Sequence, residues 1–364
     1  MNDTAKKILR VLFMLLRRTL LVVLTVALLA LGAVCLVCNL VFNGPSPAAR
    51  DVLTMSLLEA SATKWVPALF IGEEAVEQIR ADVNVPLDEE EIKEAEVVVN
   101  IDLSATAGEW EAYPDGIRID YVYGSTYNAY VMLVRNPADV YLATSAKQFS
   151  INIEALRITQ AIKKEGAIAA INAGAFNDDG TTGDYIGRLP IGLTISEGVV
   201  RWDDGKSYYG FAGFDNNNVL VVADKMSAEE AQELGIRDGC CFGPVLIKNG
   251  VINNAEFSSN SGYNPRTAIG QRADGAVIFV CVDGRQAGSL GATYSDLINI
   301  MVEYGAVNAC NLDGGASSVM LYRDNEGRYG EAGTVVTINN PALLQSNPRH
   351  MPTFFMVRPA ESEE

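Results

Sequence analysis

The sequence has 364 residues, of which 49% are hydrophobic and 20% are charged, and its net charge is −17. This length and composition allow one large buried core or two ordinary ones, which excludes a disordered protein. The charge is uneven: residues 1–44 carry +4 and the rest of the chain carries −21. So acidic a domain repels nucleic acid, and we expect no nucleic-acid partner.

The N-terminus has the pattern of a membrane anchor. Residues 1–19 form a basic segment, and residues 20–42 contain no charged residue. A helix of this length spans a hydrocarbon core of roughly 30 Å. The basic flank predicts a cytoplasmic N-terminus and an extracellular domain, hence a single-pass protein of the cell membrane. A cleaved signal peptide is the alternative, but its apolar region usually has only about 7 to 15 residues.

Residues 43–96 separate the predicted anchor from the rest of the chain. Residues 51–82 alternate apolar and polar side chains at helical spacing, which predicts a membrane-proximal helical stalk. Residues 88–96, DEEEIKEAE, form an acidic linker.

Short runs of β-branched and aromatic residues dominate the chain from residue 97. Residues 117–123, 129–134 and 139–144 are such runs, separated by Gly, Asn and Pro, which is typical of strands and hairpins. The continuous apolar run at 167–174 fits a strand that is buried on both faces. Further strands are expected in FGPVLIKNG, RTAIGQ, AVIFVCVDG and AVNACNLDG.

Three helices are expected among these strands, at residues 154–166, 227–235 and 293–305. The first closes with two lysines and a glycine, and the other two open with the spacing of a capping box. Strands and helices are interspersed without a regular βαβ repeat. We therefore predict one α+β domain over residues 97–358, with a mixed central β-sheet and flanking helices.

Four of the expected strands end in a polar residue followed by glycine, in AINAGAFNDDG, FVCVDGR, NPRTAIG and ACNLDGG. Loops just past strand ends present functional groups from a rigid base, so four such ends could line one pocket. Asp283 and its glycine have an ordinary explanation as a turn. The two glycines after Asp313 weaken that explanation, since one is enough for a turn and two let a ligand or another backbone approach closely.

Arg266 is the cation best suited to an anionic ligand, because a planar guanidinium can bind phosphate or carboxylate through two hydrogen bonds. A structural pairing with an acid at a strand end is the alternative. Asn172 likewise either caps its strand or faces a ligand. The glycine-rich loop with Asp178, Asp179 and Asp184 lacks the ligand spacing of a known calcium loop, and we expect it to be solvated.

The cysteine and histidine content limits other chemistries. Cysteines beyond the apolar run could form disulfides outside the cell or lie as thiols in buried strands. Their spacing does not distinguish between these two alternatives. These cysteines are Cys240, Cys241, Cys281 and Cys310. The chain has one histidine, His350, which is too few for a zinc site or a two-metal phosphodiesterase. A Ser-His-Asp hydrolase is also not expected, because the sequence contains no G-x-S-x-G motif. We expect His350 at a strand start, no metal site and no cofactor.

Five motifs in the order INAGAF, FGPVLIKNG, NPRTAIG, VDGR and NLDGGASS resemble the phosphodiester glycosidase family. The resemblance covers residues 97–358 and is strongest over 168–320. It implies a hydrolase that cleaves a sugar-1-phosphodiester, of N-acetylglucosamine type, to free sugar and a phosphate monoester.

The resemblance also assigns residues by position. Arg266 matches the family's Pro-Arg-[Ser/Thr] arginine and Asp313 its Asp-Gly-Gly aspartate, and with Asp283 they form the predicted catalytic set. Ala316 stands where the family usually has a third glycine, and its methyl group would narrow the pocket. The predicted substrate-binding set is Asn172, Arg285, Gly243, Gly314, Gly315 and Ser317.

The reaction passes through an oxocarbenium-like state and expels phosphate, which is already a good leaving group. It therefore needs a cation for the phosphate and a carboxylate near the anomeric carbon. Arg266 fits the first role and Asp313 the second, with Asp283 as its substitute. Whether Asp313 attacks covalently or orients water is left open.

The predicted topology points to cell-envelope or exopolysaccharide glycans as the substrate. The alternative function is a non-catalytic module that holds an anionic envelope glycan during assembly or export. Such a module would keep Arg266 but would not need Asp313. The sequence does not predict the sugar, the acceptor or the oligomeric state.

Overall fold

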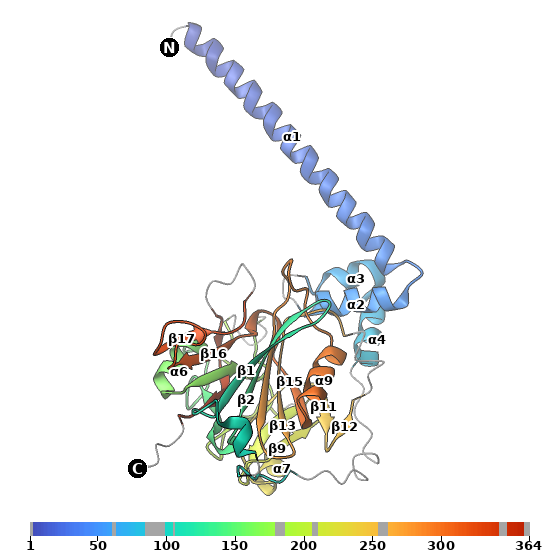
Figure 1. Ribbon diagram of the computed structural model, residues 1–364. Helices are drawn as coiled ribbons and strands as arrows, with labels where there is room; N and C mark the ends of the chain where they lie inside the picture. Colours follow the sequence, from blue (N-terminus) through green and yellow to red (C-terminus); the bar gives the residue numbers. More distant parts are fainter. Residues whose placement is uncertain are drawn as a thin grey trace.

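One long helix leads from the N-terminus to a body built of β-sheets (Figure 1). The structure, a computed structural model, describes residues 3–59, 63–83, 99–104, 106–178, 186–205, 210–253, 261–341 and 348–359. Helix α1 (Asp3–Phe42) contains an apolar segment of 31 residues, Leu12–Phe42, whose most apolar stretch has a mean hydropathy of 3.0 and no buried residue. This helix is long and apolar enough to be a membrane span or a signal anchor.

Three short helices follow α1: α2 (Pro47–Leu58), α3 (Val66–Ile71) and α4 (Glu73–Val83). Helix α2 begins at Pro47 because the Ser46 side chain accepts a hydrogen bond from the Ala49 amide. Met55 of α2 and Ile79 of α4 are buried in a hydrophobic cluster of the domain. The segment predicted as a stalk is thus helical but packs against the domain, and the predicted acidic linker lies outside the described residues.

Strands of the domain form three larger sheets and one two-stranded ribbon. The seven-stranded sheet has the order β1-β2-β14-β13-β15-β11-β12, and the five-stranded sheets have the orders β7-β6-β10-β8-β9 and β17-β16-β5-β19-β3. The strands are β1 (Ile117–Tyr123), β2 (Asn128–Val134), β3 (Val140–Thr144), β4 (Leu156–Arg157), β5 (Ala169–Asn172), β6 (Thr194–Ser196), β7 (Val199–Trp202), β8 (Phe211–Asp215), β9 (Leu220–Ala223), β10 (Ile236–Cys241), β11 (Val245–Lys248), β12 (Val251–Ile252), β13 (Arg266–Arg272), β14 (Val277–Val282), β15 (Ala306–Leu312), β16 (Met320–Asp324), β17 (Thr334–Thr337), β18 (His350–Met351) and β19 (Thr353–Val357).

The α+β class predicted from the sequence is confirmed, but the sheet arrangement differs from a single mixed sheet. Every strand pairing in the described part of the chain is antiparallel. Two parallel strands need a crossover connection of a dozen or more residues, whereas a short hairpin joins two antiparallel strands. Several pairs here, such as β1 with β2 and β13 with β14, are hairpins of consecutive strands. An apolar run predicts a buried strand but does not name its partner.

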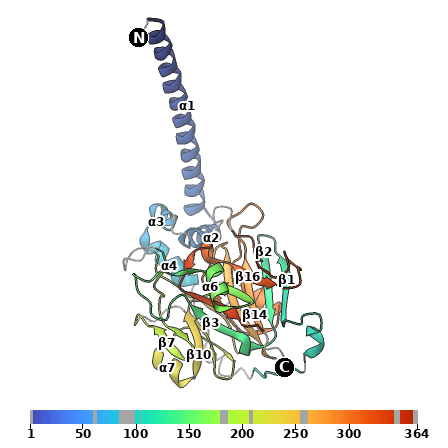
Figure 2. The same ribbon diagram turned by 90° about the vertical axis from the view of Figure 1, so that its left-hand side faces the viewer.

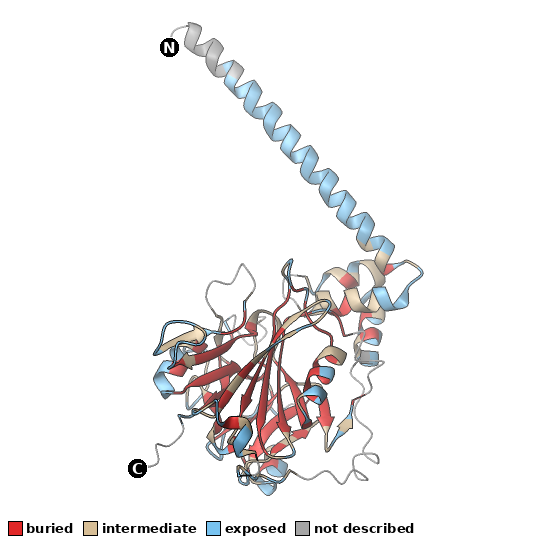
Figure 3. Cartoon of the chain, in the orientation of Figure 1, coloured by how far each residue is buried: buried red, intermediate tan, exposed pale blue. Residues whose placement is uncertain are grey.

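This arrangement buries hydrophobic residues along the sheets throughout the body (Figure 3), and two cores are the largest among the described residues. The first lies where the three larger sheets face one another and includes Phe279, Phe214 and Phe355. The second lies on the other face of the seven-stranded sheet, under α9 (Tyr294–Glu303), α2 and α4. The helices at the edge of the domain therefore share a core with the strands that carry the expected site.

The other helices begin and end close to their predicted positions. They are α6 (Ile158–Glu165) and α7 (Ala228–Glu233). Three short turns that the sequence did not predict complete the described elements: η1 (Ala107–Trp110), η2 (Pro137–Asp139) and η3 (Gly315–Ser317). Both predicted capping boxes, at Ser227 and Thr293, are formed. His350 starts β18, as predicted, and all four cysteines of the domain are buried free thiols. Burial raises the pKa of each thiol, which keeps it protonated and unreactive.

Candidate active site

Strand register brings two of the predicted motifs together. Thr267 of β13 pairs with Leu312 of β15 in an antiparallel register. Arg266, at the start of β13, and Asp313, just past the end of β15, therefore lie beside each other at one end of these two strands. Gly314 lies so close to the segment just before β13 that a Cβ atom on it would lie 2.7 Å from the Pro265 carbonyl oxygen. Gly315 donates its amide to the same oxygen at 2.8 Å and has a φ of 61°. Both glycines are therefore required by backbone packing as well as by access to the pocket.

A cleft of about 320 Å³ opens at this end of the two strands, with Arg266 and Asp313 in its wall. Of the residues predicted to bind substrate, Gly243, Gly314 and Gly315 line it. Apolar side chains form much of the remaining wall. They come from the domain as Phe176, Ile191, Phe242 and Tyr294, and from α2 as Met55 and Leu58. A volume of this size accommodates a small ligand or one or two sugar rings.

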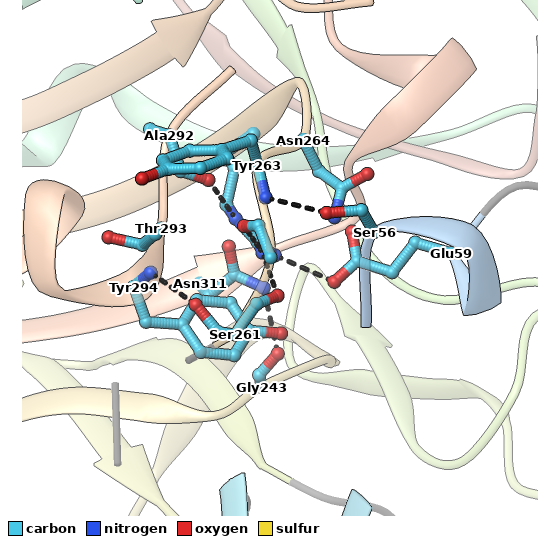
Figure 4. Close-up of polar contacts among 12 residues, drawn as sticks. Ser56, Glu59, Gly243, Ser261, Tyr263, Asn264, Ala292, Thr293, Tyr294 and Asn311 are labelled. Carbon is cyan, nitrogen blue, oxygen red and sulfur yellow. Dashed lines mark hydrogen bonds and ion pairs between the residues drawn. The ribbon is translucent and has the colours of Figure 1, made fainter. Parts of the chain in front are cut away.

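The guanidinium of Arg266 is almost fully engaged by the protein. Its side chain is 2% exposed, and Nε donates to the Ala292 carbonyl at 2.9 Å. Nη2 donates to the carbonyls of Ser261 and Gly262 at 2.9 and 3.1 Å. Nη1 forms an ion pair of 2.9 Å with Glu59 (Figure 4), and Glu59 lines the cleft whereas the partners of Nε and Nη2 do not. The Nη1 side is thus the part of Arg266 that a substrate can reach.

Two contacts fix this orientation of Arg266. Its guanidinium carbon lies 4.0 Å from the centre of the Tyr294 ring, close enough for a cation–π interaction. The Tyr294 amide in turn donates to the Ser261 hydroxyl at 2.7 Å. The first turn of α9 and the segment at 261–262 therefore present Arg266 to the cleft as a fixed cation.

Asp313 is partly exposed to the cleft and poorly solvated. Burial raises its pKa to about 7, although the nearby Ser317 hydroxyl and Arg349 act in the opposite direction. Its backbone amide donates to the Ala173 carbonyl at 3.0 Å, which fixes the loop. A carboxylate that titrates near neutral pH is suited to acid–base work or to nucleophilic attack.

Asn172 and Ser317 lie behind this loop. The Oδ1 atom of Asn172 accepts from the Thr267 hydroxyl at 2.8 Å and from the Val319 amide at 3.1 Å, and Nδ2 donates to the Asp313 carbonyl. Asn172 thereby ties β5, β13 and the Asp313 loop together. Ser317 is buried in η3, and neither residue lines the main cleft.

Asp283 also lies apart from the main cleft, beside a separate small cavity that shares Gly315 with it. Its carboxylate accepts from Tyr130 at 2.9 Å, from Asn339 at 3.3 Å and from the Asn340 amide at 2.9 Å. Burial raises the pKa of Asp283, and these hydrogen bonds counteract the rise. Its three partners come from β2 and from the segment after β17, so the carboxylate holds these parts of the fold together.

Arg285 is the less constrained of the two predicted cations. It is exposed, has a positive φ of 56° and donates from Nη2 to Asn264 Oδ1 at 3.1 Å. It forms no salt bridge within the described ranges. Its Nη1 atom would lie 3.3 Å from a Cβ atom on Gly315, which places this charge next to the Asp313 loop.

Several residues that line the cleft were absent from the sequence prediction, and Asn311 and Glu59 are two polar ones among them. Asn311 lines the cleft, donates from Nδ2 to the Gly243 carbonyl at 2.8 Å and has a buried Oδ1 without a partner among the described residues. Its position two residues before Asp313 on a strand was a usable signal, since such residues share a face. Glu59 carried no comparable signal, because nothing in the sequence indicates that the segment before residue 97 folds back onto the site.

Within the described residues no group of three His, Cys, Asp or Glu side chains is placed to hold a metal ion. Asp178 pairs with Arg349, which lies 5.0 Å from the Phe176 ring at the edge of the cleft. Asp179 and Asp184 lie outside the described residues.

A family model described as phosphodiester glycosidase matches residues 165–358, just over half of the chain. The chain belongs to the phosphodiester glycosidase family. The resemblance seen in the five sequence motifs is thereby confirmed. A curated relative of the chain, the SPbeta prophage-derived uncharacterized protein YomE of Bacillus subtilis, is 29% identical over 202 residues. That match covers 53% of this chain and only 28% of YomE.

One solved structure extends the similarity to the fold. The catalytic domain of zebrafish N-acetylglucosamine-1-phosphodiester alpha-N-acetylglucosaminidase, auto-inhibited by its pro-peptide, is 19% identical with a TM-score of 0.51, and the match covers 66% of this chain and 82% of that domain. A hypothetical protein from Synechocystis is 17% identical with a TM-score of 0.44, and the match covers 66% of this chain and 62% of that protein.

Proposed function

We propose that this phosphodiester glycosidase is a membrane-anchored extracellular hydrolase that cleaves a sugar-1-phosphodiester of N-acetylglucosamine type. Its products are the free sugar and a phosphate monoester, and its substrates are cell-envelope or exopolysaccharide glycans. The observation that carries the proposal is that Arg266 and Asp313, which come from different strands, share one cleft. The name of the zebrafish enzyme supports the choice of sugar and bond.

In this proposal the two charges act on opposite ends of the scissile bond. The Nη1 side of Arg266 binds the phosphate as negative charge develops on it, and Arg285 supplies a second cation beside the Asp313 loop. Asp313, in its ionised form, stabilises the anomeric carbon or activates the attacking water. The free Oδ1 of Asn311 accepts a hydrogen bond from a sugar hydroxyl.

A hydrolysis assay tests the proposal against the non-catalytic alternative. The full chain is incubated with a synthetic N-acetylglucosamine-1-phosphodiester, and so is its Asp313→Asn variant. We expect sugar release by the wild type and a loss of at least about 100-fold in the variant, because a carboxylate acting on the transition state contributes about that much. Binding of the diester without release of sugar by the wild type would establish a binding module instead.

The position of the label after hydrolysis in 18O-water tests which bond is cut. Attack at the anomeric carbon places 18O in the sugar, and attack at phosphorus places it in the phosphate. We expect label in the sugar alone. Label in the phosphate would overturn the glycosidase assignment while leaving the enzyme a hydrolase.

A further inference from the structure

Helix α2 lies at the end of the domain from which α1 leaves (Figures 1 and 2), and its last residues line the cleft. Helix α1 ends at Phe42, and α2, which begins at Pro47, contributes Met55, Leu58 and Glu59 to the cleft wall. A helix of 12 residues is about 18 Å long. The cleft is therefore separated from the end of the apolar helix by little more than the length of α2.

The junction between α1 and the short helices is packed. Phe42 is 2% exposed, and its ring stacks on that of Phe70 in α3 with 5.0 Å between centroids. Asn43 continues the helical hydrogen bonding, since its amide donates to the Asn39 carbonyl at 3.0 Å and its side chain donates to Asn39 Oδ1 at 2.9 Å. The end of α1 is thus held against α3 by an aromatic contact.

The far end of α2 is held against the site. The Ser56 hydroxyl accepts from the Tyr263 amide at 2.9 Å, and a Cβ atom on Gly262 would lie 2.5 Å from the Ser56 nitrogen (Figure 4). Glu59 adds the ion pair to Arg266. Since the end of α1 is held against α3 and the far end of α2 is held against the site, the distance between the cleft and the end of α1 is fixed as well.

Helix α3 carries an exposed apolar face at this end of the molecule. Trp65 is 59% exposed and Leu69 is 70% exposed. They lie four residues apart, hence on one side of the helix, next to the residue that stacks on Phe42. Lys64 is exposed beside them. Tryptophan and lysine next to the end of an apolar helix are typical of the membrane–water interface, and the bilayer that holds α1 is the surface that would cover this face.

We propose that the substrate is itself a membrane lipid: a sugar-1-phosphodiester whose second ester is a long-chain alcohol embedded in the bilayer that holds α1. This inference rests on the proposed function. The first carbons of the alcohol run along the α2 wall at Met55 and Leu58, and the sugar lies at Asp313. The bond between the anomeric carbon and the phosphate oxygen breaks, and the water oxygen becomes the new sugar hydroxyl. The other proton of that water passes to the phosphate monoester, which stays in the membrane on its lipid.

The test uses the full chain in phosphatidylcholine vesicles with its domain outside. Two substrates carry the same N-acetylglucosamine-1-phosphate group, one as a long-chain isoprenyl ester in the same vesicles and one as a soluble ethyl ester. A Trp65→Ser/Leu69→Ser variant removes the apolar face of α3 at two exposed positions, and its rate on the soluble ethyl ester reports whether the fold is retained. A Val199→Ser/Leu234→Ser variant is the control, since these residues are also exposed but belong to β7 and the end of α7, away from α1.

We expect the α3 variant to hydrolyse the isoprenyl ester at least fivefold more slowly than the wild type and the ethyl ester at an unchanged rate. The control variant should behave as wild type on both esters. Equal rates of the wild type on the two esters, or no change in the α3 variant, would overturn the lipid substrate and leave the glycosidase function intact. Hydrolysis of neither ester would overturn both.

Discussion

At the level of single residues, the protonation state of Asp313 controls the proposed reaction. Its pKa is raised to about 7 by burial, so the carboxyl is largely neutral below that pH and ionised above it. The proposed role needs the ionised form, and a phosphodiester keeps its single charge over this range. We therefore expect kcat/KM to rise with pH through about 7, and one pH unit below that value the enzyme should retain about a tenth of its plateau activity.

A pH–rate profile between pH 5 and 9 checks this expectation. Asp313→Asn should lose the rising limb together with the activity. Asp283→Asn is the matched control, because Asp283 is also a buried carboxyl with a raised pKa but lies outside the main cleft. If the limb disappeared in Asp283→Asn and survived in Asp313→Asn, the catalytic carboxylate would be the wrong one.

In the proposed reaction, we expect Glu59 to compete with the substrate for Arg266. Its carboxylate holds the one side of the guanidinium that faces the cleft, at 2.9 Å. A glutamine at this position keeps a hydrogen bond but loses its charge, and a neutral partner is weaker by about 1 kcal/mol. We expect Glu59→Gln to lower KM about fivefold with kcat nearly unchanged.

The control for Glu59 is Glu73→Gln on α4, which removes an exposed carboxylate from the same group of helices outside the cleft. Its KM should equal that of the wild type. A higher KM in Glu59→Gln would mean that Glu59 assists binding, for example through a sugar hydroxyl, and would contradict the competition.

At the level of elements, the N-terminus of α9 supports Arg266. Thr293 forms the capping box: its hydroxyl accepts from the Asp296 amide at 3.1 Å and donates to the Asp296 carboxylate at 2.7 Å. The next residue, Tyr294, stacks on Arg266. Loss of such a cap costs about 1 kcal/mol. We expect Thr293→Ala to lose that much unfolding free energy in urea and also several-fold in kcat/KM.

Ser227→Ala in α7 tests whether the activity loss is specific. The same box is formed there, with the Ser227 hydroxyl accepting from the Glu230 amide at 3.2 Å, but α7 lies away from the cleft. Its loss of stability should be similar and its activity unchanged. Equal activities of the two variants would show that α9 does not position Arg266.

The capped helices and the apolar strands were predictable because their signals are local. A capping box involves residues three apart, and a buried strand shows in its own composition. Pairing of β13 with β15 depends on residues about 40 positions apart, and no local pattern specifies it. The two glycines after Asp313 were a partial signal. They indicate that another backbone or a ligand approaches closely, but they do not identify Pro265 as the neighbouring residue. Asp283 and Asn172 carried the same strand-end pattern, and only the fold shows that their polar groups bind the protein itself.

On the scale of the whole molecule, the three helices after α1 belong to the folded domain. Met55 and Ile79 are buried in the core under α9, and Glu59 neutralises Arg266, which is 2% exposed. Burial of each apolar side chain contributes about 1.5 to 3 kcal/mol. A buried arginine that loses its partner costs a further 3 to 5 kcal/mol, approximately. The sequence predicted these helices but assigned them to a stalk, since an amphipathic pattern does not say which surface its apolar face meets.

Two truncated proteins distinguish a domain component from a stalk. A chain of residues 42–364 lacks the rest of α1 but keeps the buried Phe42, and it should unfold at the temperature of the full chain in detergent. A chain of residues 99–364 also lacks α2, α3 and α4. From the losses above, and with about 2 to 4 °C per kcal/mol for a domain of this size, its Tm should fall by at least about 10 °C. Calorimetry measures both. Equal melting temperatures of the two truncated chains would mean that α2, α3 and α4 contact the domain without stabilising it. Arg266 would then need a partner other than Glu59 in the shorter chain.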